Sequence, residues 1–187
     1  MDIAKFHYLS SMQRLCALLL ILPLSPLLLI VMIVVWIIER ERPVFLQERI
    51  GFHKEPFTIY KLRTMKKGNI TWIGKILRKT GIDELPQLFN IAMGEMNFVG
   101  PRPLTFQDID RLGWTLNSYA KRWSVKPGIT GLAQLVNVCD ADASWQNDHY
   151  YIENRSTMLD AKILFRSLLV PFVGKASAKK ILNNSIK

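Results

Sequence analysis

The sequence contains little cysteine and little histidine, the residue types that most often build disulfide frameworks and transition-metal sites. Only two cysteines and three histidines occur in 187 residues. Cys16 lies in an apolar run and Cys139 in a distant polar stretch, so no disulfide is expected and a reducing compartment is indicated. His149 has no cysteine or second histidine at ligand spacing, which argues against a zinc site.

The chain also lacks the glycine-rich patterns of P-loop and dinucleotide-binding proteins, and it has no internal repeats. Acidic residues are scarce, because 25 lysines and arginines outnumber 15 aspartates and glutamates and give a formal net charge of +10. This balance indicates an anionic partner: nucleic acid, lipid headgroups or a phosphorylated substrate. At this length a single domain with a sizeable core is expected.

What the sequence does contain is one long apolar run near its start. Residues 15–38 carry no charged side chain, and ~20 apolar residues are enough to cross a bilayer. The run lacks a small-residue cleavage site, so it is predicted to be retained rather than removed as a signal peptide. Pro23 and Pro26 remove backbone donors in its middle, so the helix should kink or break there. Ser25 can hydrogen-bond a carbonyl that is freed in this way.

Two membrane arrangements are compatible with this run. In one, a kinked helix spans the bilayer; in the other, two short helices form a re-entrant hairpin that enters and leaves on one face. Positive residues prefer the cytoplasmic side, and they flank the run on both sides. They are Lys5 and Arg14 before it, and Arg40, Arg42 and Arg49 after it. The residues alone leave both arrangements open.

A strand-like region follows the apolar run. Residues 44–50 and 57–65 are rich in β-branched and aromatic side chains, and the segment between them contains turn formers, which predicts a β-hairpin. Lys61 and Arg63 are two residues apart and should share one face of the second strand. They are either a solvated or headgroup-facing pair, or a pair that binds phosphate.

Two further segments have the character of surface helices. Residues 72–79 predict a short helix with basic and aromatic side chains, a type that often lies along a bilayer surface, and Arg78 in it is near enough to reach the acidic pair that follows. Residues 159–172 are apolar with two basic side chains, and a role at the membrane surface is favoured over a core role. The lysines of the tail, at 175, 179, 180 and 187, are expected to be drawn to anionic lipid.

The acidic pair Asp83-Glu84 stands just before Pro86, which fits only the first turn of a helix. Asp83 or Thr80 is therefore expected to cap that helix. The pair has two interpretations: it complements the helix dipole, or a carboxylate that stays ionised beside basic residues attacks phosphorus. The apolar residues expected on the buried face of the helix are Leu85, Leu88, Phe89 and Ala92.

The loop after that helix displays an arginine between two prolines. Pro101 and Pro103 fix φ and offer no donors, so Arg102 is presented rather than joined to a sheet. Its guanidinium suits phosphate oxygens; the alternative is an ordinary exposed arginine in a rigid turn. Residues 126–135 contain two glycines and a proline, which suits a loop whose backbone approaches a ligand closely.

Together these segments resemble the bacterial sugar transferases that are monotopic phosphoglycosyl transferases. Each motif is weak alone, but their order and spacing are specific and cover nearly the whole chain. The motifs are Ser25-Pro26, Gln47-x-Arg49-x-Gly51, Lys61-Leu-Arg-Thr-Met65, Asp83-Glu-Leu-Pro-Gln-Leu-Phe-Asn90, Gly94-Glu-Met-Asn-Phe-Val-Gly-Pro-Arg-Pro103, Lys126-Pro-Gly-Ile-Thr-Gly131 and Leu159-Asp-Ala-Lys162. The chain departs from the family pattern at Leu132, where tryptophan is expected, and at Lys126, where arginine is usual.

The resemblance implies an enzyme that transfers a phosphosugar from a UDP-sugar to polyprenol (undecaprenyl) phosphate, the first membrane step of glycan, exopolysaccharide or O-antigen biosynthesis. Asp83 would be the nucleophile, forming a covalent aspartyl-phosphosugar intermediate with release of UMP, and Glu84 would assist it. Mg²⁺ is the expected cofactor, with Asp83 as its ligand, and would neutralise the diphosphate. The substrate-binding candidates are Arg102, Arg78, Lys61, Arg63, Pro101 and Pro103.

The expected fold is α+β and mainly helical. Residues 1–40 would form a re-entrant helix-break-helix in the membrane with its break at Ser25-Pro26. Residues 41–187 would form one catalytic domain, with a small β-hairpin and amphipathic interfacial helices around the active site.

The resemblance places this catalytic domain on the cytoplasmic face of a bacterial inner membrane. No nucleic acid partner is expected, and the sugar, the pathway and a homo-oligomer are left open. The contrasting hypotheses are a non-catalytic, membrane-anchored basic scaffold that binds anionic lipid or partner proteins, and a transferase in which polyprenol phosphate attacks directly.

Overall fold

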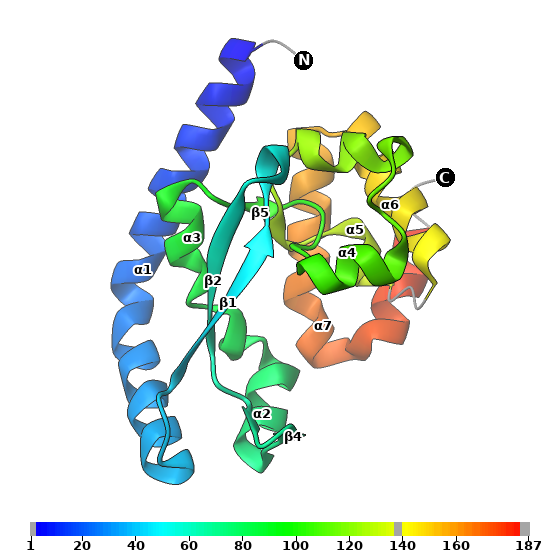
Figure 1. Cartoon of the computed structure of the whole chain (residues 1–187). Helices are drawn as coiled ribbons and strands as arrows, with labels where there is room; N and C mark the ends of the chain where they lie inside the picture. The colour runs from blue at the N-terminus through cyan, green and yellow to red at the C-terminus, as the bar shows by residue number, and fades with distance from the viewer. Residues whose placement is uncertain (1–2, 137–139, 184–187) are drawn as a thin grey trace. The chain divides into compact units, whose positions relative to one another are not determined.

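The structure is a computed structural model that describes residues 3–136 and 140–183. These residues are mainly helical, with three two-stranded sheets (Figure 1), which confirms the expected mainly helical α+β chain. The chain forms two compact units, which are described separately. The first unit comprises Met1–Glu48 and Thr58–Glu95, and the second comprises Arg49–Phe57 and Met96–Lys187.

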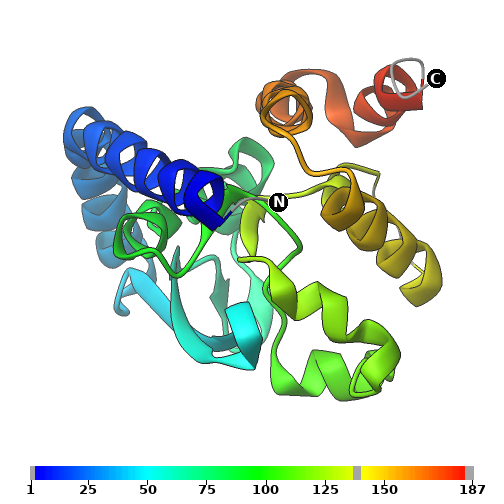
Figure 2. The same ribbon diagram turned by 90° about the horizontal axis from the view of Figure 1, so that it is seen from above.

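The longest element of the first unit is the apolar helix α1, Ile3–Glu39. Its helical structure continues through both prolines, and the ribbon changes direction near its middle (Figure 1 and Figure 2), so of the two expected outcomes the helix kinks and does not break. Among the described residues, one helical segment is long and apolar enough to cross a membrane, Ser10–Glu39, and most of its side chains are exposed. A membrane-associated helix is thereby supported. The re-entrant arrangement, and the boundary at residue 40 between a membrane segment and a catalytic domain, stay predictions.

A side-chain hydrogen bond accounts for the continuity of α1. Pro26 has no N–H to donate to the carbonyl four residues earlier, which belongs to Leu22. The Ser25 hydroxyl donates to that same carbonyl at 2.8 Å. The serine therefore supplies the hydrogen bond that the proline removes, and the helix bends without ending.

The rest of the first unit packs on α1. The strands β1, Val44–Ile50, and β2, Pro56–Leu62, form the predicted hairpin, and β3, Met65–Lys66, pairs with β4, Asn69–Ile70. Helix α3, Gln87–Met93, lies along α1. The apolar core between these elements consists of Leu28, Val35, Leu62, Ile73 and Leu77.

Helix α2, Trp72–Thr80, has the amphipathic character that its sequence predicts. Thr71 caps it by accepting a hydrogen bond from the Gly74 N–H, and Ile73 and Leu77 are buried while Trp72 remains 62% exposed. Gly81 ends the helix in the left-handed region, with φ at 75°. The position of α2 on a bilayer surface stays a prediction.

The second unit is a helical assembly around one short parallel pair of strands, β5, Asn97–Val99, and β6, Gly128–Thr130. A Cβ atom on Gly128 would collide with the backbone of Gly100. The glycines of the 126–131 motif therefore let backbone approach backbone, whereas an approach to a ligand was expected. The helices are α4, Phe106–Leu112; η3, Asn117–Ser124; α5, Leu132–Val136; α6, Ala141–Glu153; and α7, Thr157–Asn183.

Two apolar clusters hold the second unit together. One gathers Val99, Leu132, Leu135, Tyr151 and Ile163, and the other gathers Ile50, Leu104, Ile109, Trp114 and Trp123. The tail lysines that were expected at a lipid surface lie outside the residues whose side chains are described, and so does Cys139. Cys16 is a free, exposed cysteine.

Candidate active site

The acidic pair lies on a short 3-10 turn, η2, Ile82–Glu84, between α2 and α3. The predicted capping role is wrong, because neither η2 nor α3 has a side-chain cap. Thr80 is instead the last residue of α2, and its hydroxyl bonds the carbonyls of Ile76 and Leu77. Side-chain capping therefore does not explain the two adjacent carboxylates.

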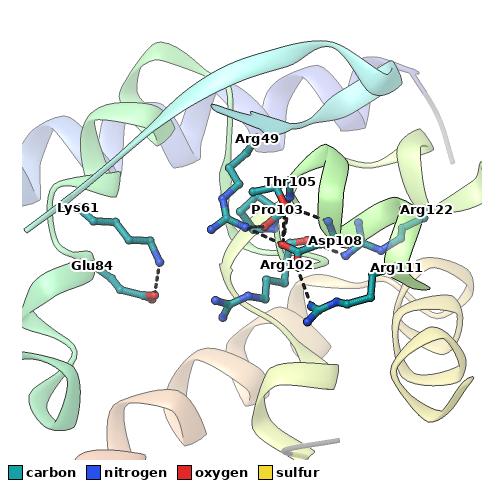
Figure 3. A network of polar contacts seen from close by, with 9 residues as sticks. All are labelled: Arg49, Lys61, Glu84, Arg102, Pro103, Thr105, Asp108, Arg111 and Arg122. Atoms are coloured by element: carbon teal, nitrogen blue, oxygen red, sulfur yellow. Dashed lines mark hydrogen bonds and ion pairs between the residues drawn. The ribbon is translucent and has the colours of Figure 1, made fainter. Parts of the chain in front are cut away.

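The two carboxylates of the pair have different surroundings. Asp83 is buried, with 8% of its surface exposed, whereas the half-buried Glu84 forms an ion pair with Lys61 at 2.8 Å (Figure 3). Burial raises the pKa of Asp83, and the neighbouring charge of Glu84 adds to the rise. Lys61 and Arg78 pull the same pKa down but do not cancel the rise. The sequence led us to expect a carboxylate that stays ionised beside basic residues; burial, which the sequence did not reveal, instead makes Asp83 more basic than an ordinary aspartate.

The three basic residues predicted near the pair separate into two groups. Lys61 bonds Glu84, and Arg78 lies close enough to lower the pKa of Asp83 while its Nε donates to Thr64 Oγ1 at 2.9 Å.

Arg63 contacts residues away from the acidic pair. It forms an ion pair with Glu41 at 3.1 Å and donates to the Arg42 carbonyl at 2.8 Å. The strand β2 ends at Leu62, so Arg63 lies just outside it. The alternation that would place Arg63 on the same face as Lys61 does not extend to it.

In the second unit, the Pro-Arg-Pro turn is held through its carbonyl groups. The Pro101 carbonyl accepts from the Gly128 N–H at 3.0 Å. The Arg102 carbonyl accepts from Arg122 Nη2 at 2.6 Å, and the Pro103 carbonyl accepts from Arg49 Nη1 at 3.1 Å (Figure 3). Both prolines are buried, while the Arg102 side chain is exposed. The turn therefore fixes the backbone of Arg102 and leaves its guanidinium available.

An apolar groove of about 750 Å³ opens in the first unit. Phe89 lines it and is 46% exposed, so its expected burial is wrong. The buried face of α3 instead includes two polar side chains, Gln87 and Asn90. The groove is lined by Ile21, Ser25, Pro26, Leu28, Leu29 and Met32 of α1 with Val44, Tyr60, Pro86, Phe89 and Met93. Such a surface suits a hydrocarbon chain.

Some polar residues near these sites were not predicted. Gln87 is 2% exposed and its Nε2 has no hydrogen-bond partner among the described residues. Its place directly after Asp83-Glu-Leu-Pro in the family motif is the signal that could have found it. Arg122 and Asp148 form a buried pair across 26 residues of sequence, and no local pattern could reveal that contact.

The residues present fit Mg²⁺ only in part. No group of three His, Cys, Asp or Glu residues able to hold a metal occurs in the described part of the chain. Mg²⁺ is commonly bound through one or two carboxylates together with substrate phosphates. The pair Asp83 and Glu84 supplies that kind of donor set, so the ion is expected with a diphosphate and not alone.

Comparison with known sequences gives the family. A sequence model described as bacterial sugar transferase matches residues 6–174. The chain belongs to the bacterial sugar transferase family. The resemblance drawn from the motifs is thereby confirmed, and the acidic turn, the Pro-Arg-Pro turn and the apolar groove all lie within the matched residues.

Several relatives of this family member have specific names. A UDP-N-acetylgalactosamine-undecaprenyl-phosphate N-acetylgalactosaminephosphotransferase of Aeromonas hydrophila is 35% identical over 88% of this chain and 43% of its own length. A UDP-glucose:undecaprenyl-phosphate glucose-1-phosphate transferase of Klebsiella pneumoniae is 34% identical over 85% of this chain and 39% of its own. The uncharacterized sugar transferase EpsL of Bacillus subtilis is 43% identical, over 65% and 66%. The chain thus spans less than half the length of the first two.

Proposed function

We propose that this chain is a phosphoglycosyl transferase that moves a phosphosugar from a UDP-sugar to undecaprenyl phosphate. The observation that carries the proposal is the buried Asp83 beside Glu84 on a turn without a side-chain cap, with Lys61 and Arg78 close to it. The names of two relatives describe this class of reaction.

The first step is an attack by a carboxylate oxygen of Asp83 on the phosphorus that carries the sugar. A bond forms between that oxygen and phosphorus, and the bond from phosphorus to the bridging oxygen breaks, so UMP leaves with the electron pair. The raised pKa of Asp83 makes its ionised form a better nucleophile than an ordinary aspartate. The product is an aspartyl-phosphosugar.

The second step returns the enzyme to its starting state. A phosphate oxygen of undecaprenyl phosphate attacks the same phosphorus, and the acyl phosphate bond to Asp83 breaks to release the carboxylate. Glu84, held by Lys61 at 2.8 Å, orients the pair or accepts a proton. Arg102 binds phosphate oxygens through its exposed guanidinium. Asp83 would hold Mg²⁺ together with the donor diphosphate, and the ion would supply positive charge that makes UMP a better leaving group.

The lipid acceptor is assigned to the apolar groove. Its lining from α1 and α3 is almost wholly apolar, so a polyprenyl chain would meet surroundings there that match the hydrocarbon of the bilayer. The groove includes Pro86, three residues after the proposed nucleophile. Both substrates would meet at the cytoplasmic face of the inner membrane, where the basic flanks of α1 are expected.

Trapping the intermediate tests this mechanism. The wild-type protein is mixed with UDP-sugar labelled in the sugar, without lipid, and is expected to retain label and to release an equal amount of UMP. The variant D83N should retain none, whereas D110N, which changes an exposed aspartate of α4, should behave as wild type. Turnover with lipid but without labelled protein would instead indicate direct attack by the lipid, and no turnover at all would favour the scaffold hypothesis.

Topology can be tested on the intact cell. With Cys16 and Cys139 replaced by serine, a single cysteine at residue 3 should stay shielded from an impermeant thiol reagent outside the cell. A cysteine introduced at Glu41 should be shielded in the same way, because a hairpin keeps both ends of α1 inside. Labelling at residue 3 alone would establish a spanning helix.

A further inference from the structure

The second unit contains an arginine that is buried from every side. The side chains of Arg122 in η3 and Asp148 in α6 are 3% and 4% exposed, and Arg122 Nε donates to Asp148 Oδ2 at 3.0 Å. The guanidinium also lies over two indole rings, 5.0 Å from the ring centre of Trp114 and 5.1 Å from that of Trp123. Its position and its orientation are therefore both fixed.

The remaining edge of this guanidinium points to the Pro-Arg-Pro turn. Arg122 Nη2 donates to the backbone carbonyl of Arg102 at 2.6 Å (Figure 3). The prolines on both sides of Arg102 have no N–H, so the turn is held mainly through the carbonyls that it offers. Arg122 donates to the central one of the three carbonyls of the turn, that of Arg102.

Stability alone is a weak reason for such a pair. A buried ion pair carries a large desolvation cost, and apolar residues of similar volume often replace it without loss of stability. What apolar residues cannot supply is a donor aimed at the Arg102 carbonyl. A lysine at position 122 could carry the charge but could not bind the carboxylate and the carbonyl through one rigid planar group.

We infer that Arg122, oriented by Asp148, is a positioning residue that sets the backbone of Arg102 and so aims its guanidinium at the donor phosphates. The inference rests on the proposed function, since it takes Arg102 as a phosphate ligand. Arg122 is too deeply buried to touch the substrate itself. Its effect on turnover passes through Arg102.

A double-mutant cycle tests this route. In UMP-release assays with UDP-sugar and undecaprenyl phosphate, R122K should lower kcat/KM by about ten- to a hundredfold, the scale of a misplaced binding group. In a protein that already carries R102A, the same change should lower kcat/KM by less than about twofold, because the group that it positions is gone. Equal losses in both backgrounds would show that Arg122 acts on general stability and would overturn the inference.

The chain offers a matched control on the same two elements. Lys121 and Glu153 also join η3 to α6, at 2.8 Å, but their side chains are 61% and 48% exposed. K121Q should leave kcat/KM within about twofold of wild type. A loss comparable to that of R122K would mean that any contact between η3 and α6 matters, which contradicts a specific route through Arg102.

A second variant covers the case in which R122K does not fold. The double variant R122M/D148L removes both charges together and is expected to fold, yet it leaves the Arg102 carbonyl without its donor. The Gly128 N–H donates to the Pro101 carbonyl of the same turn at 3.0 Å, so amide hydrogen exchange at Gly128 should become faster than in wild type, and unchanged exchange would overturn the inference. This readout needs no turnover, so it still decides the matter if the wild-type protein releases no UMP and the proposed function fails.

Discussion

The two turns that carry the proposed chemistry are held in opposite ways. In the first unit, the acidic turn is tuned through its side chains, since Lys61 bonds Glu84 directly and Arg78 acts on the charge of Asp83. In the second unit, the Pro-Arg-Pro turn is fixed through its backbone, and the Arg102 side chain stays exposed. A nucleophile needs a set basicity, whereas a phosphate ligand needs a set position, and each turn meets the need of its own residue.

The largest effect should come from the nucleophile itself. D83N is expected to reduce the rate of UMP release by at least about a thousandfold, because an amide cannot form the acyl phosphate. The measurement is kcat with saturating UDP-sugar and undecaprenyl phosphate, with D110N as the control. Residual activity above about a tenth of wild type would remove Asp83 from the mechanism.

The second-largest effect should come from the proposed phosphate ligand, Arg102. R102K keeps the charge but loses the planar fork, so kcat/KM for the UDP-sugar should fall by about ten- to a hundredfold. R111K makes the same change at an exposed arginine of α4, whose side chain is 75% exposed and pairs with Asp108. It should have little effect. If the two variants behave alike, the Pro-Arg-Pro turn does not present a phosphate ligand.

A smaller and selective effect is expected in the apolar groove. F89Q should raise KM for undecaprenyl phosphate by about tenfold, since a buried aromatic contact with the lipid is replaced by a polar group. KM for the UDP-sugar should stay the same. Phe106, which is 57% exposed in the second unit, gives the control variant F106Q. An equal change in both KM values would place the groove outside the lipid site.

The smallest expected effect is a shift in the pH dependence of kcat/KM, and this shift has opposite directions in two variants. Glu84 raises the pKa of Asp83, so E84Q should move the acidic limb of kcat/KM to lower pH. Lys61 lowers that pKa, so K61Q should move the same limb to higher pH. The direction of each shift is measured from pH–rate profiles, even where kcat itself falls. If the acidic limb moves in the same direction in E84Q and in K61Q, it reports a group other than Asp83.

Local sequence predicted much of this chain. The hairpin of β1 and β2 and the helix α2 appear where alternation and turn residues indicated them, and the family followed from the order of the motifs. Both turns were singled out from the sequence, and the order of the family motifs, not the residues alone, favoured a chemical role for Asp83-Glu84 and Pro101-Arg-Pro103 over capping and over an ordinary exposed arginine.

The errors arise where an element ends earlier, or packs through other residues, than its regular sequence pattern implies. The capping role failed because Gly81 ends α2 and leaves only a 3-10 turn before α3. Phe89 was assigned to the core by helical spacing, but the face of α3 that packs is partly polar. Arg63 was paired with Lys61 by strand alternation, yet the chain leaves the strand at Leu62 and Glu41 captures the arginine.

The carbonyl-held turn has a practical consequence for protein engineering. Because the backbone at position 102 is fixed by its own carbonyl and by its two neighbours, the side chain there can be exchanged without rebuilding the loop. A cysteine at this position would carry a fluorescent or spin label on a rigid base. Because this exchange removes the proposed phosphate ligand, such a label would report the surroundings of the turn, in a protein whose framework around the label is unchanged.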